Sequence, residues 1–253
     1  MKKILKNLYL KYLYRHCPGY VKIGNITFRL DAGDSLRLWR NRTYSPYVLE
    51  KCLEYLPVDG VAIDAGASIG WFACHMAERA TTVLAVEPNL DQFRTLHSNL
   101  FVYQKARAIN YALGAEACMG SLQIDPDNGS GGRMAQHLLD AGKDIQQVPV
   151  ITLDELLEER LVNNVDLLKM DCEGSEWNIL QGFKRLKDFM PVIVTEINKH
   201  AMRALHSSSA EYWHYLHDYG YVYYLDEADE VNYEVVRNEL PADGNYLVVP
   251  RCR

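Results

Sequence analysis

The amino-acid sequence predicts an α/β fold, with a mostly parallel sheet of seven strands, helices on both faces and an antiparallel last strand. Three observations lead to this fold class. Short apolar runs alternate along the chain with stretches of helical length and periodicity. These runs are apolar almost continuously, which is typical of parallel strands buried on both faces. The 253 residues, 48% of them hydrophobic, are enough to bury one large core.

Charge is distributed unevenly along the chain. Residues 1–42 contain ten Lys or Arg against Asp31 and Asp34, a net charge of +8, so residues 43–253 carry −14 if the whole chain carries −6. We therefore divide the chain into a basic N-terminal extension, residues 1–43, and one folded domain, residues 44–253. The acidic domain argues against a nucleic-acid partner, because it would repel a phosphate backbone. The basic extension suits an anionic membrane or a phosphate-bearing ligand.

The first fifteen residues mix basic and apolar side chains. Lys6 and Lys11 interrupt the apolar residues, so no run is long enough for a secretion signal or a membrane span. One interpretation is an amphipathic helix in peripheral contact with an anionic membrane, and the alternative is a terminal helix docked on the domain. The six cysteines form no C-x-x-C pair, which predicts reduced thiols in a cytoplasmic protein and no zinc site.

Local signals place the elements of the first half of the chain. Pro57 and the turn Asp59-Gly60 end a helix, and two apolar runs end in the acidic residues Asp64 and Glu87. The predicted elements are a hairpin or edge strands at 20–30, helices at 47–56, 71–79 and 91–100, and strands at 61–64 and 82–86.

In the second half, two capping boxes begin helices, Thr152 with Glu155 and Ser208 with Glu211. The predicted strands are 106–113, 120–124, 148–151, 165–171, 191–197, 221–225 and 246–249, and the predicted helices start at Thr152, span 175–187 and run from Ser208 to about Tyr219. The polar stretch 125–132, which continues to about Gln147, is interpreted as a surface excursion, with an active-site lid as the alternative.

The strongest motif is the loop Asp64-Ala65-Gly66-Ala67-Ser68-Ile69-Gly70, which connects a strand to a helix. Gly66 allows a sharp turn, Ala67 and Ser68 let a ligand approach the backbone, and Gly70 permits close packing. An aspartate leading into such a loop suits a ligand with a cationic end. S-adenosylmethionine carries a sulfonium and an ammonium group, so this loop favours it as the cofactor.

A second motif follows 23 positions after Asp64, where Glu87 ends the next strand and can accept hydrogen bonds from both ribose hydroxyls. We also expect Pro88, Asn89, Ala112 and Asp171 to contact the cofactor. A nicotinamide cofactor is the rival, but it usually requires G-x-G-x-x-G for its pyrophosphate, and Ser68 occupies the central glycine position.

These motifs resemble the FkbM family of S-adenosylmethionine-dependent methyltransferases. The resemblance covers residues 44–197, and its most specific part is K-x-D-x-E-G-x-E, here Lys169 to Glu176. It implies a Rossmann-like fold and O-methylation of sugars or of natural-product hydroxyls. Two positions depart from the family pattern: Ser68 stands where Asn is usual, and Ser45 precedes Pro46 where a glutamate is common. The basic extension suggests an acceptor that carries phosphate or is lipid-linked.

Candidate catalytic residues follow two neighbouring strands. Asp171 ends the strand at 165–171, and Glu173 follows it. Glu196 lies at the end of the strand at 191–197, and His200 follows that strand. Like charges this close should raise the pKa of at least one carboxyl group, which suits a base. Glu176 is either a functional residue or simply an acid favoured at a helix N-terminus. Lys169 either forms a structural ion pair with these acids or binds a phosphate on the acceptor. Paired acids could hold Mg²⁺, but no motif requires a metal, and we predict none.

The sequence therefore predicts an S-adenosylmethionine-dependent methyltransferase for a sugar, glycan or natural-product hydroxyl. Two alternatives stay open at this point: a nicotinamide-dependent oxidoreductase and a non-catalytic cofactor-binding protein. The sequence does not indicate an oligomeric state.

Overall fold

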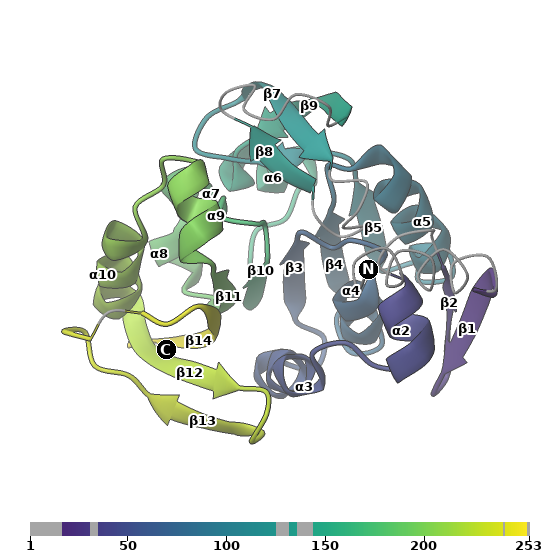
Figure 1. Ribbon diagram of the computed structural model, residues 1–253, viewed down its shortest axis with the longest axis horizontal. Helices are drawn as coiled ribbons and strands as arrows, with labels where there is room; N and C mark the ends of the chain where they lie inside the picture. Colours follow the sequence, from purple (N-terminus) through teal and green to yellow (C-terminus); the bar gives the residue numbers. More distant parts are fainter. Residues whose placement is uncertain (1–16, 31–34, 125–131, 136–143, 240, 252–253) are drawn as a thin grey trace, which may run out of the picture.

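A computed structural model of the chain describes residues 17–30, 35–124, 132–135, 144–239 and 241–251 (Figure 1). The predictions for residues 1–15 and for much of the polar stretch 125–147 lie outside these ranges. Among the described residues, no helix is both long enough and apolar enough to cross a membrane.

The main sheet contains seven of the nine predicted strands and one more, in the order β13-β12-β14-β11-β10-β3-β4-β5. Five neighbouring strands, β11 to β5 in this order, are parallel, and β14 is antiparallel to both of its neighbours, as predicted for the last strand. The bounds are β3 Val61–Ala65, β4 Thr82–Val86, β5 Ala106–Ile109, β10 Leu167–Met170, β11 Val192–Ile197, β12 Gly220–Asp226, β13 Val231–Glu234 and β14 Gly244–Pro250. The sequence did not predict β13, which pairs with β12 as a hairpin and whose side chains are all exposed.

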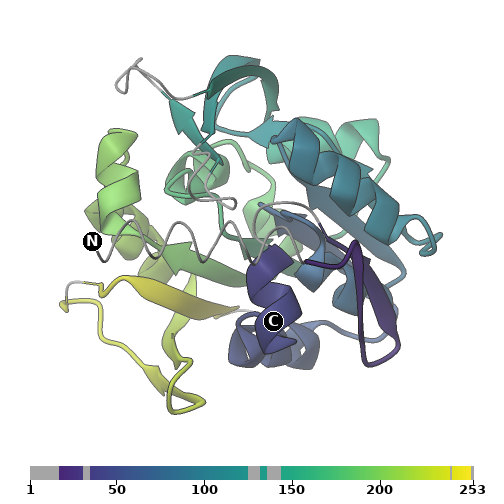
Figure 2. The ribbon, with the colours of Figure 1, turned by 45° about the vertical axis from the view of Figure 1, so that its right-hand side comes forward.

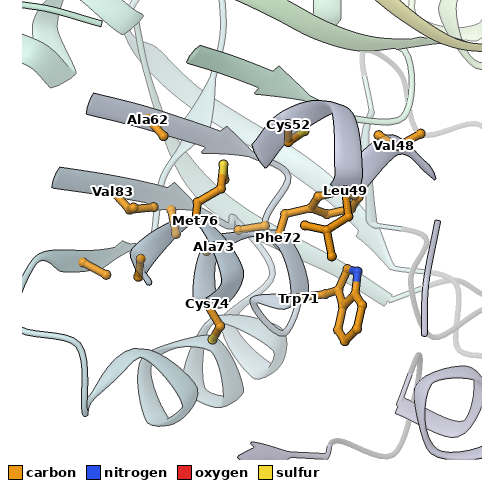
Figure 3. Packing of buried hydrophobic residues seen from close by; sticks show 14 of the residues in the cluster. Val48, Leu49, Cys52, Ala62, Trp71, Phe72, Ala73, Cys74, Met76 and Val83 are labelled. Carbon is orange, nitrogen blue, oxygen red and sulfur yellow. The ribbon is translucent and has the colours of Figure 1, made fainter. Parts of the chain in front are cut away.

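Helices cover both faces because successive strand residues point to opposite sides. Ala62 of β3 belongs to the cluster that packs under α3 (Pro46–Tyr55), α4 (Trp71–Ala77) and α5 (Leu90–Leu100). Figure 3 shows side chains of α3 and α4 against β3 and β4 in this layer. Ile63, the next residue of β3 after Ala62, belongs to the opposite layer, with α6 (Leu153–Glu159), α7 (Glu176–Gln181), α8 (Leu186–Phe189) and α10 (Ser209–Tyr219).

One predicted capping box is complete and the other is half made. Thr152 Oγ1 accepts from Glu155 N at 3.1 Å, and Glu155 Oε2 accepts from Thr152 N at 2.9 Å. Ser208 Oγ accepts from Glu211 N at 3.2 Å, but the Glu211 carboxylate accepts from the indole of Trp177 instead. Both hydroxyls satisfy an N–H group that the first turn of a helix leaves unpaired.

The predicted helix 175–187 is wrong in its length, since the chain leaves helical structure after α7 and resumes in α8. Gly182 follows α7, and a Cβ atom there would lie 2.2 Å from the carbonyl oxygen of Gly114. The close approach of these two backbones fixes where α7 ends.

A second, four-stranded sheet has the order β6-β9-β7-β8, and the sequence did not separate it from the main sheet. Its strands are β6 Ala112–Leu113, β7 Cys118–Ile124, β8 Gly132–Ala135 and β9 Asp144–Ile151. Figure 1 shows this small sheet between α5 and α7. The Gln146 side chain of β9 accepts from Leu90 N at 3.2 Å, which ties the small sheet to the start of α5.

The described part of the N-terminal extension packs on the domain. It forms the predicted hairpin, β1 (Tyr20–Ile23) with β2 (Ile26–Arg29), and then α2 (Ser35–Asn41), beside α5 in Figure 2. Asn99 of α5 accepts from Arg29 N at 2.6 Å and donates to the carbonyl of Ile69 at 2.8 Å. One buried amide thus joins the hairpin to the loop after β3.

Candidate active site

A cavity of about 1100 Å³, including its open mouth, lies where β3, β4, β5 and β10 end. Chain order reverses between β3 and β10, and parallel sheets bind ligands at such switch points. Seven of the residues predicted to bind a cofactor line this cavity: Gly66, Ala67, Ser68, Glu87, Pro88, Ala112 and Asp171. Asp64, Gly70 and Asn89 are not part of its lining.

The glycine loop turns in a backbone conformation that side chains rarely adopt. Gly66 has φ +75°, and a Cβ atom there would lie 1.9 Å from the carbonyl oxygen of Asp171. Gly66 N and Ala67 N both donate to the carbonyl of Val86 at 3.0 Å, so the loop rests on the end of β4. Gly70 has φ +95° and allows α4 to approach Leu96 of α5. The glycines are therefore required by close backbone approach.

Ser68 also has a positive φ, +47°. Asparagine tolerates this left-handed conformation better than most residues, which gives a physical reason for the asparagine usual at this position. The Ser68 Oγ atom is buried and has no hydrogen-bond partner among the described residues. A hydroxyl in this state can donate to an anionic group of a bound ligand.

Glu87 is 5% exposed and is held at the end of β4 by two backbone donors. Its Oε2 accepts from Ser68 N at 2.9 Å and its Oε1 accepts from Asn89 N at 2.8 Å. Burial raises the pKa of Glu87 to about 7, although these two donors lower it. Each oxygen keeps a further lone pair, so the carboxylate can still accept hydroxyl groups of a ligand.

Asn89 and Asn110 support this turn from outside the cavity. The Asn89 side chain caps α5 by accepting from Asp91 N and Gln92 N. The Asn110 side chain donates to the carbonyls of Glu87 at 2.8 Å and Pro88 at 3.0 Å. The predicted cofactor residue Asn89 therefore positions Glu87, and Asn110, which the sequence did not indicate, has the same effect.

Asp64 does not face the cavity, which changes the role expected for it. It is fully buried, and its Oδ1 lies 3.2 Å from Lys169 Nζ, the residue paired with it across β3 and β10. Lys169 Nζ also donates to the carbonyl of Gly66 at 3.3 Å and lies 4.7 Å from the centre of the Phe72 ring. Burial alone would lower the pKa of Lys169, but the charges of Asp64 and Asp171 raise it above its usual range. A structural ion pair of Lys169 is present as predicted, but its partner is Asp64 and not one of the acids that follow β10.

The acidic motif after β10 forms a tight turn that Glu176 holds together. Glu176 is 1% exposed, and its Oε1 accepts from Cys172 N at 2.6 Å and from Gly174 N at 3.4 Å. Glu173 has φ +52° and Gly174 has φ +98°. A Cβ atom at Gly174 would lie 2.6 Å from the backbone of α9 (Lys199–Ala204). Glu176 is thus a structural residue, and the turn it holds places Asp171 and Glu173 at the cavity.

Glu196 lies at the end of β11, one position beyond the pair Met170 and Thr195. Burial and the nearby charges of Asp171, Glu176 and Glu173 raise the pKa of its carboxyl group to about 8. The predicted acid cluster is therefore present in space. Asp171 and Glu173 line the cavity, and Glu196 lies beside it without being part of the lining. The structure does not bring His200 into the cluster, because His200 is exposed on α9.

Much of the cavity wall comes from segments that no sequence motif assigned to the site. Tyr111 and Leu113 follow β5, and Gln92 lies on α5. Further lining residues come from the extension, the segment before α3, α4 and the small sheet: Leu38, Tyr44, Trp71, Phe72, Leu122 and Met134. Leu122 and Met134 show that the small sheet covers part of the cavity. Within the described ranges, no group of three or more His, Cys, Asp or Glu residues is arranged to hold a metal ion.

These residues fit S-adenosylmethionine. Glu87 is a buried carboxylate that can accept ribose hydroxyls, and Ser68 Oγ, without a partner among the described residues, can donate to a carboxylate. Tyr111, Ala112 and Leu113 form a wall against which a base can pack. Glu87, Asp171 and Glu173 make the cavity favourable for a ligand with a positive charge.

Fold and site together define a Rossmann-like α/β methyltransferase. The family model described as "Methyltransferase FkbM domain" matches residues 64–223. The chain belongs to this family, and its methyl donor is S-adenosylmethionine.

Relatives of known name are similar to the chain over most of their length. The "Hexuronic acid methyltransferase AglP" of Haloferax volcanii is 26% identical over 187 residues, which cover 72% of this chain and 74% of that protein. The "31-O-demethyl-FK506 methyltransferase FkbM" of Streptomyces tacrolimicus is 27% identical over 63% of this chain and 72% of that protein.

Solved structures of methyltransferases are similar at a lower level. An rRNA methylase from Streptococcus thermophilus has a TM-score of 0.43 at 11% identity, over 81% of this chain and 90% of that one. The Pyrococcus abyssi tRNA (uracil-54, C5)-methyltransferase in complex with S-adenosyl-L-homocysteine has a TM-score of 0.46 at 11% identity, over 91% of this chain and 44% of that one.

Proposed function

We propose that the protein methylates a hydroxyl group of a sugar, a glycan or another natural product. The observation that supports this most is the group of acids at the cofactor cavity: Asp171 and Glu173 line it, and burial together with their charges raises the pKa of the neighbouring Glu196 to about 8. An alcohol must lose its proton when it accepts a methyl group, so a carboxylate base suits this reaction. Two relatives are named for a hexuronic acid and for an O-demethylated natural product, in agreement with such acceptors.

Each part of the cavity has its own role in this reaction. S-adenosylmethionine supplies an electrophilic methyl group when bound. Glu87 and Ser68 hold the donor in place, and the small sheet excludes water from it with Leu122 and Met134. Asp171 and Glu173 accept hydrogen bonds from the acceptor and align its hydroxyl oxygen, which lowers the barrier by positioning. Glu196 takes the proton, because its raised pKa makes its carboxylate a stronger base than an ordinary glutamate.

Replacement of Glu196 by glutamine is expected to lower kcat by a factor of about 100 or more, since it removes the base and keeps the shape. Below the pKa of about 8, the fraction of ionised Glu196 falls as pH falls. The wild-type rate should therefore rise with pH up to this value, by at most about tenfold per pH unit, and the rate of the variant should lose this dependence. Initial rates of methyl transfer from pH 6 to 9 measure both effects.

The matched control is Glu234→Gln, which removes an exposed carboxyl group on β13. It should leave the rate and the pH profile unchanged, and both variants should bind S-adenosylhomocysteine like the wild type. A Glu196→Gln enzyme with the wild-type rate and pH profile would show that Glu196 is not the base.

A further inference from the structure

Carboxyl groups gather at the cavity. Glu87, Asp171 and Glu173 line it. Glu176 and Glu196 are not part of the lining, but they lie beside it, close enough to Asp171 for their charges to interact. These side chains are grouped by the fold, because β10, β11 and the turn held by Glu176 end at the same edge of the sheet.

Positive charge at the cavity is already neutralised. Of the cationic side chains that the structure describes, Lys169 alone lines the cavity, and it is 4% exposed. Asp64 pairs with it at 3.2 Å and the carbonyl of Gly66 accepts from it at 3.3 Å. Burial raises the pKa of Glu87 and Glu176 to about 7 and that of Glu196 to about 8, so these three groups are partly ionised at neutral pH. Asp171 and Glu173 add two carboxyl groups to the cavity, and S-adenosylmethionine adds a net charge of about +1, so the net charge stays negative and becomes more so as pH rises.

We propose that the acceptor is a neutral, hydroxyl-bearing ring, and that the site rejects acceptors with an anionic group beside the methylated hydroxyl. This inference rests on the proposed function and narrows its substrate class. The proposed acceptor also differs from the hexuronic acid in the name of the Haloferax volcanii relative, because that acid is anionic. A phosphate on the acceptor, which the basic extension suggested, has to lie away from the methylated ring.

The chemistry of recognition supports the same class. Ionised carboxylates only accept hydrogen bonds, and the hydroxyl groups of a neutral sugar are donors. Asp171 and Glu173 can therefore each bind ring hydroxyls, whereas a uronate or phosphate brings acceptor atoms and a like charge to the same place. The repulsion is strong because a partly buried site screens charges less than water does.

The first test compares two acceptors that share one ring, methyl β-glucoside and methyl β-glucuronide, by mass gain in the presence of the methyl donor. The expected result is methylation of the glucoside at ten or more times the rate of the glucuronide. In Glu173→Gln the ratio of glucuronide to glucoside turnover should rise several-fold, and in the control Glu234→Gln it should not change. Turnover of the glucuronide at an equal or higher rate overturns the inference.

The second test needs no acceptor and measures the charge at the reacting centre. S-adenosylmethionine and S-adenosylhomocysteine differ by the methyl group and the positive charge on sulfur, so negative surroundings favour the former. We expect tighter binding of S-adenosylmethionine in the wild type, and a preference reduced several-fold in Glu173→Gln and Glu196→Gln. An absent or unchanged preference overturns the inference. If the protein prefers S-adenosylmethionine but methylates neither sugar, the result supports the excess of negative charge. The same result contradicts the proposed sugar acceptor.

Discussion

Replacement of Gly66 by alanine is expected to destabilise the protein by about 2–5 kcal/mol, the sum of the cost of a left-handed backbone for alanine and that of overpacking. The new Cβ atom would meet the carbonyl oxygen of Asp171 at 1.9 Å, and this contact cannot be relieved by turning a side chain. The loop and the end of β10 have to separate, so binding of S-adenosylhomocysteine should weaken by a factor of a hundred or more. Denaturant unfolding and calorimetric titration measure the two effects.

The control for this substitution is Gly19→Ala. No atom lies within 4 Å of the position of its Cβ, and its φ is not in the left-handed region. The free energy of unfolding should change by less than about 0.5 kcal/mol, as for ordinary surface substitutions. A Gly66→Ala protein as stable as this control would contradict the close approach of the loop and β10.

Replacement of Lys169 by methionine is expected to cost about 3–5 kcal/mol, because it leaves the carboxylate of Asp64 buried without its partner. Asp64 is fully buried, and Lys169 Nζ is 3.2 Å from its Oδ1. Without the lysine, the buried side chain of Asp64 is most stable in the folded protein as the neutral acid. The folded state therefore binds a proton that the unfolded state releases. The loss of stability should therefore grow as pH rises above the ordinary aspartate pKa of about 4.

The double variant Asp64→Asn, Lys169→Met separates charge from packing. It removes both charges and keeps similar volumes, so it should be more stable than Lys169→Met alone and should lose the added pH dependence. Urea unfolding of ligand-free protein at several pH values gives both comparisons. A Lys169→Met protein within about 1 kcal/mol of the wild type would show that Asp64 does not depend on this ion pair.

The main sheet was predictable because its strands carry signals in their own sequence. β4 is apolar after Thr82 and ends before Glu87, and the Gly66 loop marks the turn after β3. The small sheet was not predictable as a separate layer, because the runs that form β7 and β9 look like strands whichever sheet they join. The end of α7 depends on contact between Gly182 and Gly114, which are distant in sequence.

In the site, too, residues of local motifs were predictable, and residues that tertiary packing brings there were not. Gly66, Ser68 and Glu87 belong to local motifs, and all three line the cavity. The role of Asp64 depends on the register of β3 against β10, which sets Lys169 beside it. Local spacing could not reveal this pairing, so a buried ion pair was taken for a ligand contact. Cavity residues such as Leu38 and Met134 reach the site only through tertiary packing.

The central claim is that the cavity at the ends of β3, β4 and β10 binds a methyl donor through Glu87. Calorimetric titration of the purified protein with S-adenosylhomocysteine and with NAD⁺ tests it most directly, with Glu87→Gln as the second protein. The expected result is one site for S-adenosylhomocysteine, at least tenfold weaker in Glu87→Gln, and no binding of NAD⁺. Binding of NAD⁺ in place of S-adenosylhomocysteine, or equal affinity in both proteins, would contradict the claim.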